Sequence, residues 1–205
     1  MKNKEHVLNF TSDIAFTPSV KALQQRYGSR RSYEKMENGR GWLDTLTAPL
    51  IDFISHRDSF YMATSTKEGQ PYIQHRGGAP GFLKVIDTKT LAFADFSGNQ
   101  QYISAGNLVE NAKAFLFLMD YPSKTRVKIW GEAKVEYDDT ELINSLAVSG
   151  YTAKVERAFI FTINAVDVNC PQHIVERYTL DEIEQMMVQL KERITKLEKE
   201  INTLK

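Results

Sequence analysis

The stretch that decides the fold runs from Gln70 to Gly131 and reads QPYIQHRGGAPGFLKVIDTKTLAFADFSGNQQYISAGNLVENAKAFLFLMDYPSKTRVKIWG. Its segments are short, rich in Val, Ile, Phe and Tyr, and bounded by Gly, Pro, Asn or Asp, which is the pattern of β-strands and their turns. Two glycine-rich turns in it carry Arg, Lys, Asn, Gln and Ser. Such turns present backbone N–H groups to anions such as phosphate. The stretch therefore predicts a ligand site in a β-barrel.

The pattern extends outward on both sides. Further strands are predicted over residues 58–66, 125–137 and 156–168, and the apolar run 112–120 predicts a strand buried on both faces. Helices are predicted after the capping pair Thr17-Pro18 and over residues 48–57, 103–110 and 138–150. We expect the helix at 48–57 to plug one end of the barrel. The basic segment 29–40 is interpreted either as a solvated face or as an arm folded over an anionic ligand.

The predicted strand 71–76 places two polar groups together. Because side chains alternate along a strand, Tyr72, Gln74 and Arg76 share one face, and Ile73 and His75 share the other. Two hydrogen-bond donors on one face beside paired glycines indicate an anion site. The alternative for Arg76 is a surface arginine on an edge strand.

A second polar cluster precedes the predicted helix 103–110. Asn99, Gln100 and Gln101 come just before it, and Ser104 lies in its first turn. The N-terminus of a helix binds phosphate through its free N–H groups, so we interpret these residues as ligand-binding, with a simple capped hairpin loop as the alternative. Lys84, in an otherwise apolar strand, is a phosphate candidate or an exposed edge residue.

The predicted strand 125–137 also alternates. Arg126, Lys128 and Trp130 share one face, and Val127 and Ile129 share the other. We expect Trp130 to pack at a dimer interface or to stack on substrate.

The order of these segments resembles the FMN-binding split-barrel superfamily over roughly residues 58–167. The closest fit is its pyridoxamine 5'-phosphate oxidase-related branch, whose members carry similar FTPSVKALQ, QHRGGxPGFLKV, GNLxEN and NCPQHI segments, here residues 16–24, 74–85, 106–111 and 169–174. The resemblance implies a mainly β (α+β) split barrel with peripheral helices and a homodimer with FMN at the subunit interface. It implies an FMN-dependent oxidoreductase that transfers hydride through flavin N5, with NAD(P)H as a candidate partner and an unidentified small molecule as substrate.

The resemblance also assigns residues. The family's phosphate arginine corresponds to Gln74 here, and close relatives have Arg where this chain has Gln100; Arg76 and Lys84 are expected to compensate. Arg126 occupies a flavin-contacting position, and the strand end at Asp95 lies against the isoalloxazine. The predicted FMN-binding residues are Gln74, Arg76, Lys84, Asn99, Gln100, Gln101, Ser104 and Arg126. No catalytic side chain is predicted.

The C-terminal segment carries a separate signal. Apolar residues recur at alternating spacings of three and four, at Leu180, Ile183, Met187, Leu190, Ile194, Leu197, Ile201 and Leu204. This heptad repeat predicts a parallel two-stranded coiled coil, with Arg193–Glu198 and Glu200–Lys205 as attractive pairs between chains; the alternative is an amphipathic helix folded onto its own domain. It stands in place of the Trp and Arg-Leu-Ala-Pro ending of the true oxidase, so we do not expect oxidation of pyridoxamine phosphate.

Composition narrows the function. The 205 residues contain 26 basic and 26 acidic side chains, a balance that gives no electrostatic case for nucleic acid or an acidic membrane. Cys170 is the single cysteine, so no intrachain disulfide forms, and we expect a cytoplasmic protein without a membrane span. Cys170 and His173 lie three residues apart, but nothing completes a triad or a metal-ligand spacing, and no metal is expected.

Three domains are predicted: an N-terminal helical arm with a barrel-packing helix at 1–57, the core at 58–175, and the C-terminal helix at 176–205. Two functions compete with the oxidoreductase. One is a non-catalytic flavin-binding or sensor dimer, whose coiled coil serves as a partner surface. The other is a haem-binding split barrel, for which the imidazole ligands available are His6, His56, His75 and His173.

Overall fold

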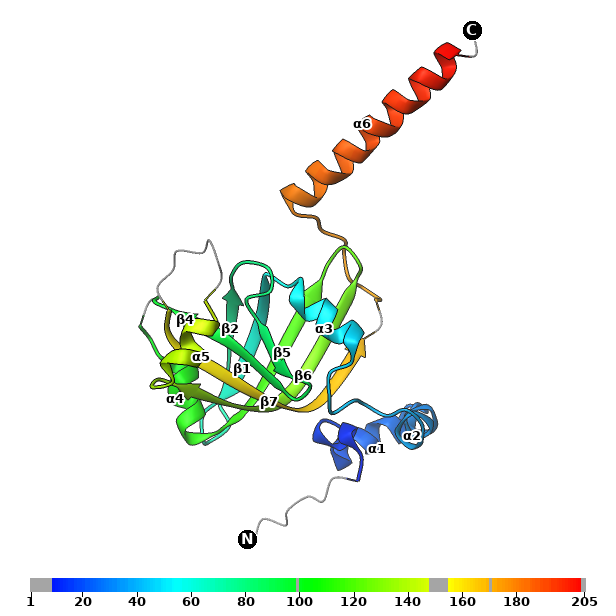
Figure 1. Ribbon diagram of the computed structural model, residues 1–205. Coiled ribbons are helices and arrows are strands. Elements are labelled where there is room, and N and C mark those ends of the chain that lie inside the picture. The colour runs from blue at the N-terminus through cyan, green and yellow to red at the C-terminus, as the bar shows by residue number, and fades with distance from the viewer. Residues whose placement is uncertain (1–8, 99, 148–154, 170, 204–205) are drawn as a thin grey trace. The chain divides into compact units, whose positions relative to one another are not determined.

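A computed structural model describes residues 9–98, 100–147, 155–169 and 171–203. The chain forms two compact units, one of residues 1–119 and 126–170 and the other of residues 120–125 and 171–205. The first unit is a sheet with peripheral helices, which confirms the predicted mainly β (α+β) class (Figure 1). The three-domain division stays a prediction.

A seven-stranded antiparallel sheet forms the first unit, in the order β2-β1-β5-β6-β7-β4-β3. The strands are β1 (Ser59–Ser65), β2 (Pro71–Gly77), β3 (Lys84–Asp87), β4 (Thr90–Phe96), β5 (Lys113–Asp120), β6 (Thr125–Glu136) and β7 (Val155–Asn169). The β1–β2 hairpin turns at Gly69, which has a φ of +92°. Glycine adopts a positive φ with little strain because it has no Cβ.

The helices are η1 (Thr11–Ile14), α1 (Pro18–Arg26), α2 (Arg30–Asn38), α3 (Ala48–Ser55), α4 (Ile103–Glu110), α5 (Thr140–Ser145) and α6 (Leu180–Thr203). As predicted, the Thr17 hydroxyl caps α1 by accepting from the Val20 N–H. Residues 148–150 of the helix predicted over 138–150 lie outside the described part of the chain. None of the helices in the described ranges is long and apolar enough to span a membrane.

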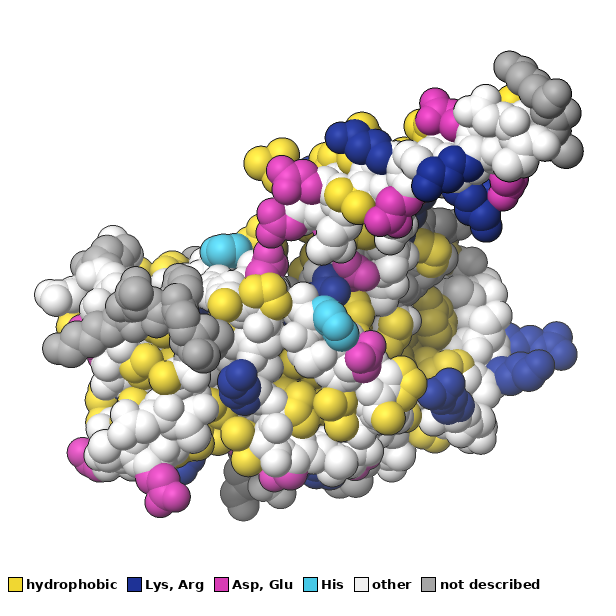
Figure 2. Space-filling view, turned by 45° about the horizontal axis from the view of Figure 1, so that its top comes forward, with side chains coloured by type: hydrophobic (Ala, Val, Ile, Leu, Met, Phe, Trp, Pro, Cys, Tyr) yellow, Lys and Arg dark blue, Asp and Glu magenta, His cyan; other side chains and the backbone are white. Residues whose placement is uncertain are grey.

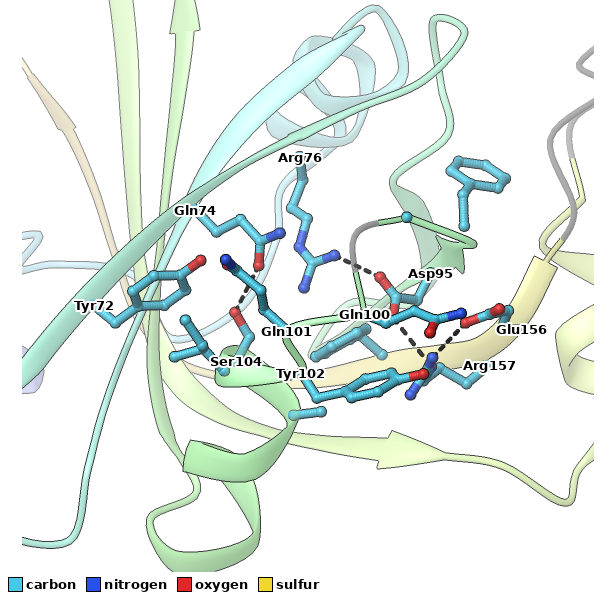
Figure 3. A pocket seen from close by; sticks show the side chains of 15 residues that line it. Tyr72, Gln74, Arg76, Asp95, Gln100, Gln101, Tyr102, Ser104, Glu156 and Arg157 are labelled. Carbon is cyan, nitrogen blue, oxygen red and sulfur yellow. Dashed lines mark hydrogen bonds and ion pairs between the residues drawn. The ribbon is translucent and has the colours of Figure 1, made fainter.

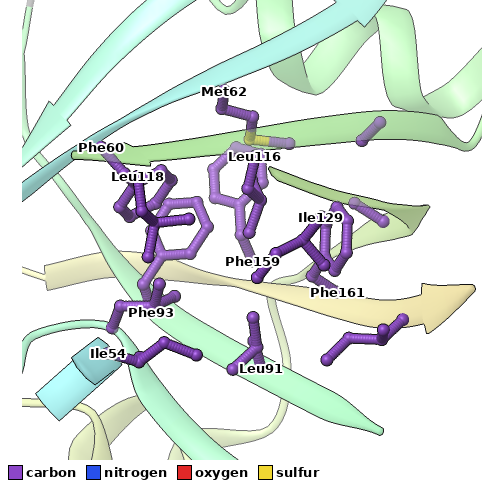
Figure 4. Close-up of a cluster of buried hydrophobic side chains, with 14 of the residues drawn as sticks. Ile54, Phe60, Met62, Leu91, Phe93, Leu116, Leu118, Ile129, Phe159 and Phe161 are labelled. Carbon is purple, nitrogen blue, oxygen red and sulfur yellow. The ribbon is translucent and has the colours of Figure 1, made fainter. Parts of the chain in front are cut away.

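The sheet rolls around an aromatic core (Figure 4). The rings of Phe93 and Phe159 stack with centroids 5.0 Å apart, and Phe60 meets Phe93 edge-on at 5.1 Å. Leu50 and Ile54 of α3 are buried in the same cluster, which supports the expectation that this helix closes one end of the barrel. Such burial supplies most of the stabilising free energy of a domain this size.

Strand β5 departs from its prediction. Its inward residues, such as Leu116 and Leu118, are fully buried, whereas Phe115 and Phe117 on the outer face are only half-buried. The outer face is partly covered by the N-terminal arm, residues 9–47. Trp130 of β6 was expected at a dimer interface or on substrate. Its ring instead stacks on that of Trp42 in this arm, with the centroids 4.8 Å apart, and the Phe115 ring meets the Trp130 ring edge-on.

The arm has a polar interior. Arg30, expected on a solvated face or over a ligand, is buried and ion-paired with Glu37, and it donates to the Gln24 side chain. Leu23 of α1 is 52% exposed while Gln24 is buried, so the inward face of α1 is its polar one. The buried Asp13 carboxylate accepts from Lys21 Nζ at 2.6 Å and from the Asn9 and Phe10 N–H groups.

The second unit contains α6. Thr179 begins the helix with reciprocal bonds: its hydroxyl accepts from the Glu182 N–H, and the Glu182 carboxylate accepts from the Thr179 N–H. An ion pair of 2.5 Å joins Lys124 to Glu176 in the same unit. No residue of α6 is buried.

Gly131 marks a place where two strands approach closely. The β6–β7 register shifts between Trp130 and Gly131, and a Cβ on Gly131 would lie 2.0 Å from the Thr162 carbonyl oxygen. We predict that Gly131→Ala lowers the free energy of unfolding by about 1–3 kcal/mol through this overlap. The matched control is Gly106→Ala in α4, where a Cβ meets nothing within 4 Å and should stabilise by about 0.5–1 kcal/mol. Equal urea midpoints for both variants would contradict the register.

Acid should release the arm. Burial raises the pKa of Asp13, but the Lys21 ammonium and two backbone N–H groups lower it more, so its pKa lies below the usual value. A carboxyl group whose pKa is lowered by folding stabilises the folded state fully when the pH is above the unfolded-state pKa of about 3.9. This stabilisation is lost as the pH falls through the folded-state pKa. We therefore predict a change in tryptophan fluorescence below about pH 4 as the Trp42–Trp130 stack opens. The Asp13→Asn variant should lack this transition. If its acid titration superimposes on that of the unsubstituted protein, Asp13 is not the group that holds the arm.

Candidate functional site

A pocket opens between β2, β4, β7 and the first turn of α4 (Figure 3). Its lining residues are Tyr72, Gln74, Arg76, Asp95, Phe96, Gly98, Gln100, Gln101, Tyr102, Ile103, Ser104, Ala105, Glu156, Arg157 and Phe159. The structure thus brings together five predicted ligand residues, Gln74, Arg76, Gln100, Gln101 and Ser104.

Two of the other three predicted residues lie elsewhere. Lys84 is on β3, paired in register with Ala92, and is absent from the pocket lining. Arg126 is on the outer face of β6, with its Nε buried and without a hydrogen bond in the described part of the chain. Asn99 lies outside the described residues. Of the predicted ligand residues, those on β2, in the loop before α4 and in the first turn of α4 line the pocket, whereas Lys84 does not.

The loop before α4 and the first turn of α4 line the pocket. Gln100 and Tyr102 have φ of 57° and 55°, a left-handed conformation that costs free energy for residues other than glycine. Tyr102 is the N-cap of α4, and its side chain makes no capping hydrogen bond. The first N–H groups of a helix lack intrahelical partners, and Ile103, Ser104 and Ala105 of this turn line the pocket. This end of α4 can therefore receive an anion.

A row of polar contacts fixes α4 against the sheet. The Ser104 hydroxyl donates to Gln74 Oε1 of β2, and the Asn107 amide donates to the Thr64 hydroxyl of β1, both at 2.9 Å. One turn further, Asn111 donates to the Ser65 hydroxyl, also at 2.9 Å. Spacings of three and four place these side chains on one face of the helix. They hold the N-terminus of α4 beside Arg76.

Two arginines share one carboxylate in the pocket. Arg76 Nη1 donates to Asp95 Oδ1 at 2.5 Å, and Arg157 Nε lies 3.1 Å from Asp95 Oδ2. Arg157 also donates to the neighbouring Glu156 carboxylate. Both arginine Nε atoms are buried and lack an aligned hydrogen bond in the described chain. The cluster therefore has two positive and two negative charges, with donor capacity left over.

Aromatic rings hold both guanidinium groups in place. Arg76 Cζ lies 4.7 Å from the Phe159 ring centroid, and Arg157 Cζ lies 4.8 Å from that of Tyr102. A cation over an aromatic face is stabilised by the ring quadrupole. Burial lowers the pKa of Arg157, but the hydrogen bond to Glu156, the tyrosine hydroxyls and the Asp95 charge raise it more, so the pKa lies above its usual value. Arg157 is therefore a permanent cation.

Sequence reasoning missed Arg157 and Glu156. Arg157 lies in the largely apolar run ERAFIFTI. A cation within an apolar strand is the same signal that singled out Lys84. Its side chain is 9% exposed, and a charge so deeply buried requires a partner. Arg76 is not the surface residue of the alternative interpretation, because its side chain is 14% exposed and ion-paired.

The structure places three of the four histidines at the surface. His56, His75 and His173 are all exposed, and His6 lies outside the described part of the chain. Within the described ranges no three His, Cys, Asp or Glu side chains are grouped to hold a metal ion. Cys170, the partner of His173 in sequence, also lies outside the described residues.

The cavity itself tests the fit to FMN. It has a volume of about 70 Å³, several times what one water needs, and is lined by guanidinium, amide and hydroxyl groups suited to phosphate. Pockets that enclose a drug-sized ligand measure about 300–1,000 Å³. The residues present therefore fit the phosphate end of FMN, and the ring system would have to lie outside this cavity.

Comparisons with known proteins agree with the fold. The family model described as Pyridoxamine 5'-phosphate oxidase matches residues 46–186. No curated protein matches the chain. HupZ from Group A Streptococcus, 18% identical, aligns over 65% of this chain and 99% of that one with a TM-score of 0.50, which shows a shared fold.

Two further solved structures align less closely. An FMN-binding protein from Syntrophomonas wolfei is 16% identical over 74% of this chain and 97% of that one, with a TM-score of 0.44. A Clostridium acetobutylicum protein related to general stress protein 26, of the pyridoxinephosphate oxidase family, is 15% identical over 64% of this chain and 92% of that one, with a TM-score of 0.45.

Proposed function

The chain belongs to the pyridoxamine 5'-phosphate oxidase family, and we propose that it is an FMN-dependent oxidoreductase acting on a small molecule. The observation that carries this proposal is the pocket in which Arg76, Arg157 and the uncapped end of α4 converge. Guanidinium groups and a helix N-terminus are the groups that proteins use to bind phosphate. A cytoplasmic location stays a prediction.

The chain's own residues position the cofactor. Arg76 and Arg157 would hold the phosphate of FMN. Gln74, Ser104 and Gln101 line the same pocket and would form hydrogen bonds with the hydroxyl-bearing chain that joins the phosphate to the flavin ring. A bound flavin supplies hydride transfer at N5, and the protein supplies binding, orientation and electrostatics. No side-chain nucleophile is invoked.

We further propose that a second copy completes the site. The cavity admits only the phosphate, so the flavin ring needs a wall from elsewhere. The outer face of the sheet offers apolar surface for such a contact: Ile73 is 61% exposed and Tyr61 40% exposed on neighbouring strands. Beside them, Phe115 and Phe117 of β5 are half-buried. These apolar side chains on neighbouring strands form the surface that we propose for this contact.

The C-terminal helix supports the same homodimer. Its a and d side chains are exposed, including Leu190 at 57% and Ile194 at 54%, and charged groups flank them (Figure 2). In a parallel coil Arg193 meets Glu198 of the other chain. An antiparallel coil with residue 194 opposite 197 would also pair opposite charges, Arg193 with Glu200. We propose the parallel form, in which Ile at a and Leu at d favour two strands over three or four. Leu204 and Lys205 lie outside the described residues.

Purified protein should carry the paired absorption bands of an oxidised flavin, with FMN released in one-to-one amount and identified by mass. Bleaching by NADH or NADPH, followed by reoxidation with an acceptor, is the result expected of an oxidoreductase. A flavin inert to both donors would favour the binding or sensor protein instead. A Soret band without flavin, or a colourless protein that takes up no FMN, would refute the proposal.

Disulfide trapping tests the parallel coil. In a full-length Cys170→Ser background, Leu190→Cys should oxidise to a covalent dimer, because d positions of parallel helices face each other. Glu192→Cys, at the outward f position, is the matched control and should stay monomeric on a non-reducing gel. Cross-linking only between Leu190→Cys and Ile201→Cys chains would show antiparallel pairing and contradict the prediction.

A further inference from the structure

We propose that Asp95 is a resident counter-ion that holds Arg76 and Arg157 in place and yields them to a phosphate monoester. The identification of the monoester as FMN rests on the proposed function; the anion site itself does not.

The geometry places one carboxylate between two cations that come from distant strands. Arg76 on β2 and Arg157 on β7 reach different oxygens of Asp95 on β4, and all three side chains line the pocket (Figure 3). Each guanidinium has five N–H donors, of which one carboxylate can use only a few. The buried and unaligned Nε atoms show that Asp95 leaves both arginines incompletely satisfied.

A phosphate monoester satisfies these donors better than Asp95 does. It offers three acceptor oxygens and up to two negative charges, whereas Asp95 offers two oxygens and one charge. The pocket also presents the first turn of α4, whose N-cap Tyr102 makes no side-chain cap. A carboxylate fixed on β4 serves the arginines alone, but a phosphate in the cavity can meet the arginines and the helix together.

Charge balance gives the direction of the effect. With Glu156 on Arg157, the four charged side chains sum to zero, so an incoming dianion gains from two cations and is repelled by two carboxylates. In a partly buried site these repulsions are screened less than in water. Removing the charge of Asp95 should therefore tighten phosphate binding, and removing the charge of Arg157 should weaken it.

A purely structural role for the cluster makes a different prediction. If Asp95 only ties β2 to β4 and β7, its substitution would lower stability and weaken all ligands alike. The discriminating quantity is therefore the ratio of the dissociation constants of riboflavin and FMN, which differ only in the phosphate. A change in thermal stability does not affect this ratio.

The experiment measures both dissociation constants by quenching of flavin fluorescence in the apoprotein. Asp95→Asn should raise the riboflavin-to-FMN ratio by roughly tenfold or more, and Arg157→Gln should lower it by a similar factor. Arg31→Gln, an exposed arginine of α2 outside the pocket lining, is the matched control and should leave the ratio unchanged. Unchanged ratios in Asp95→Asn and Arg157→Gln, with FMN still bound, would overturn the inference and leave the proposed function standing.

A second readout separates the two failures. NMR signals of the arginine Nε–H groups are followed in flavin-free protein during titration with inorganic phosphate. The Arg76 and Arg157 signals should shift, and at lower phosphate concentration in Asp95→Asn. If they shift but no variant binds FMN, the anion site holds and the FMN function fails. If phosphate moves neither signal, the counter-ion role is refuted.

Discussion

An ion pair at the pocket joins two strands that are not neighbours in the sheet. Arg76 on β2 and Asp95 on β4 are five places apart in the strand order, yet their side chains meet at 2.5 Å. The sheet must therefore roll until these strands face each other. Arg76 also lies over the Phe159 ring of the core, so the same side chain closes the barrel and forms the floor of the pocket. Removing one partner of such a buried pair would leave an uncompensated charge, which is costly.

The polar cluster and the aromatic core occupy different parts of the barrel. The polar cluster occupies the mouth of the barrel, and the aromatic core behind it holds the strands in register. The polar contacts of α4 bring its N-terminus to the cluster, and this end of the helix then adds backbone donors without adding charge. One chain thus builds the anchoring end of a ligand site, and the apolar outer face and the exposed α6 are the surfaces available for a second copy.

Local features were predictable from the sequence, and long-range ones were not. The bounds of α4 agree to the residue, and the alternation of β2 correctly placed Gln74 and Arg76 on one face, because both depend on short spacings. The contact of Arg76 with Asp95 depends on how the sheet rolls, and that of Arg157 with Asp95 depends on the pairing of β4 with β7, and no local pattern encodes either. The basic segment 29–40 was interpreted as a solvated face or as an arm over a ligand, whereas Arg30 is buried against Gln24 and Glu37. The Trp42–Trp130 stack likewise joins segments nearly ninety positions apart.

The central claim is that the pocket between β2, β4, β7 and α4 anchors the phosphate of a flavin. The most direct measurement is an experimental structure of the full-length protein with FMN bound. The account predicts the phosphate between the guanidinium groups of Arg76 and Arg157 at the first turn of α4, with Asp95 moved away from at least one of them. A phosphate bound beside Lys84 or Arg126, with the Arg76–Asp95–Arg157 cluster unchanged, would contradict it.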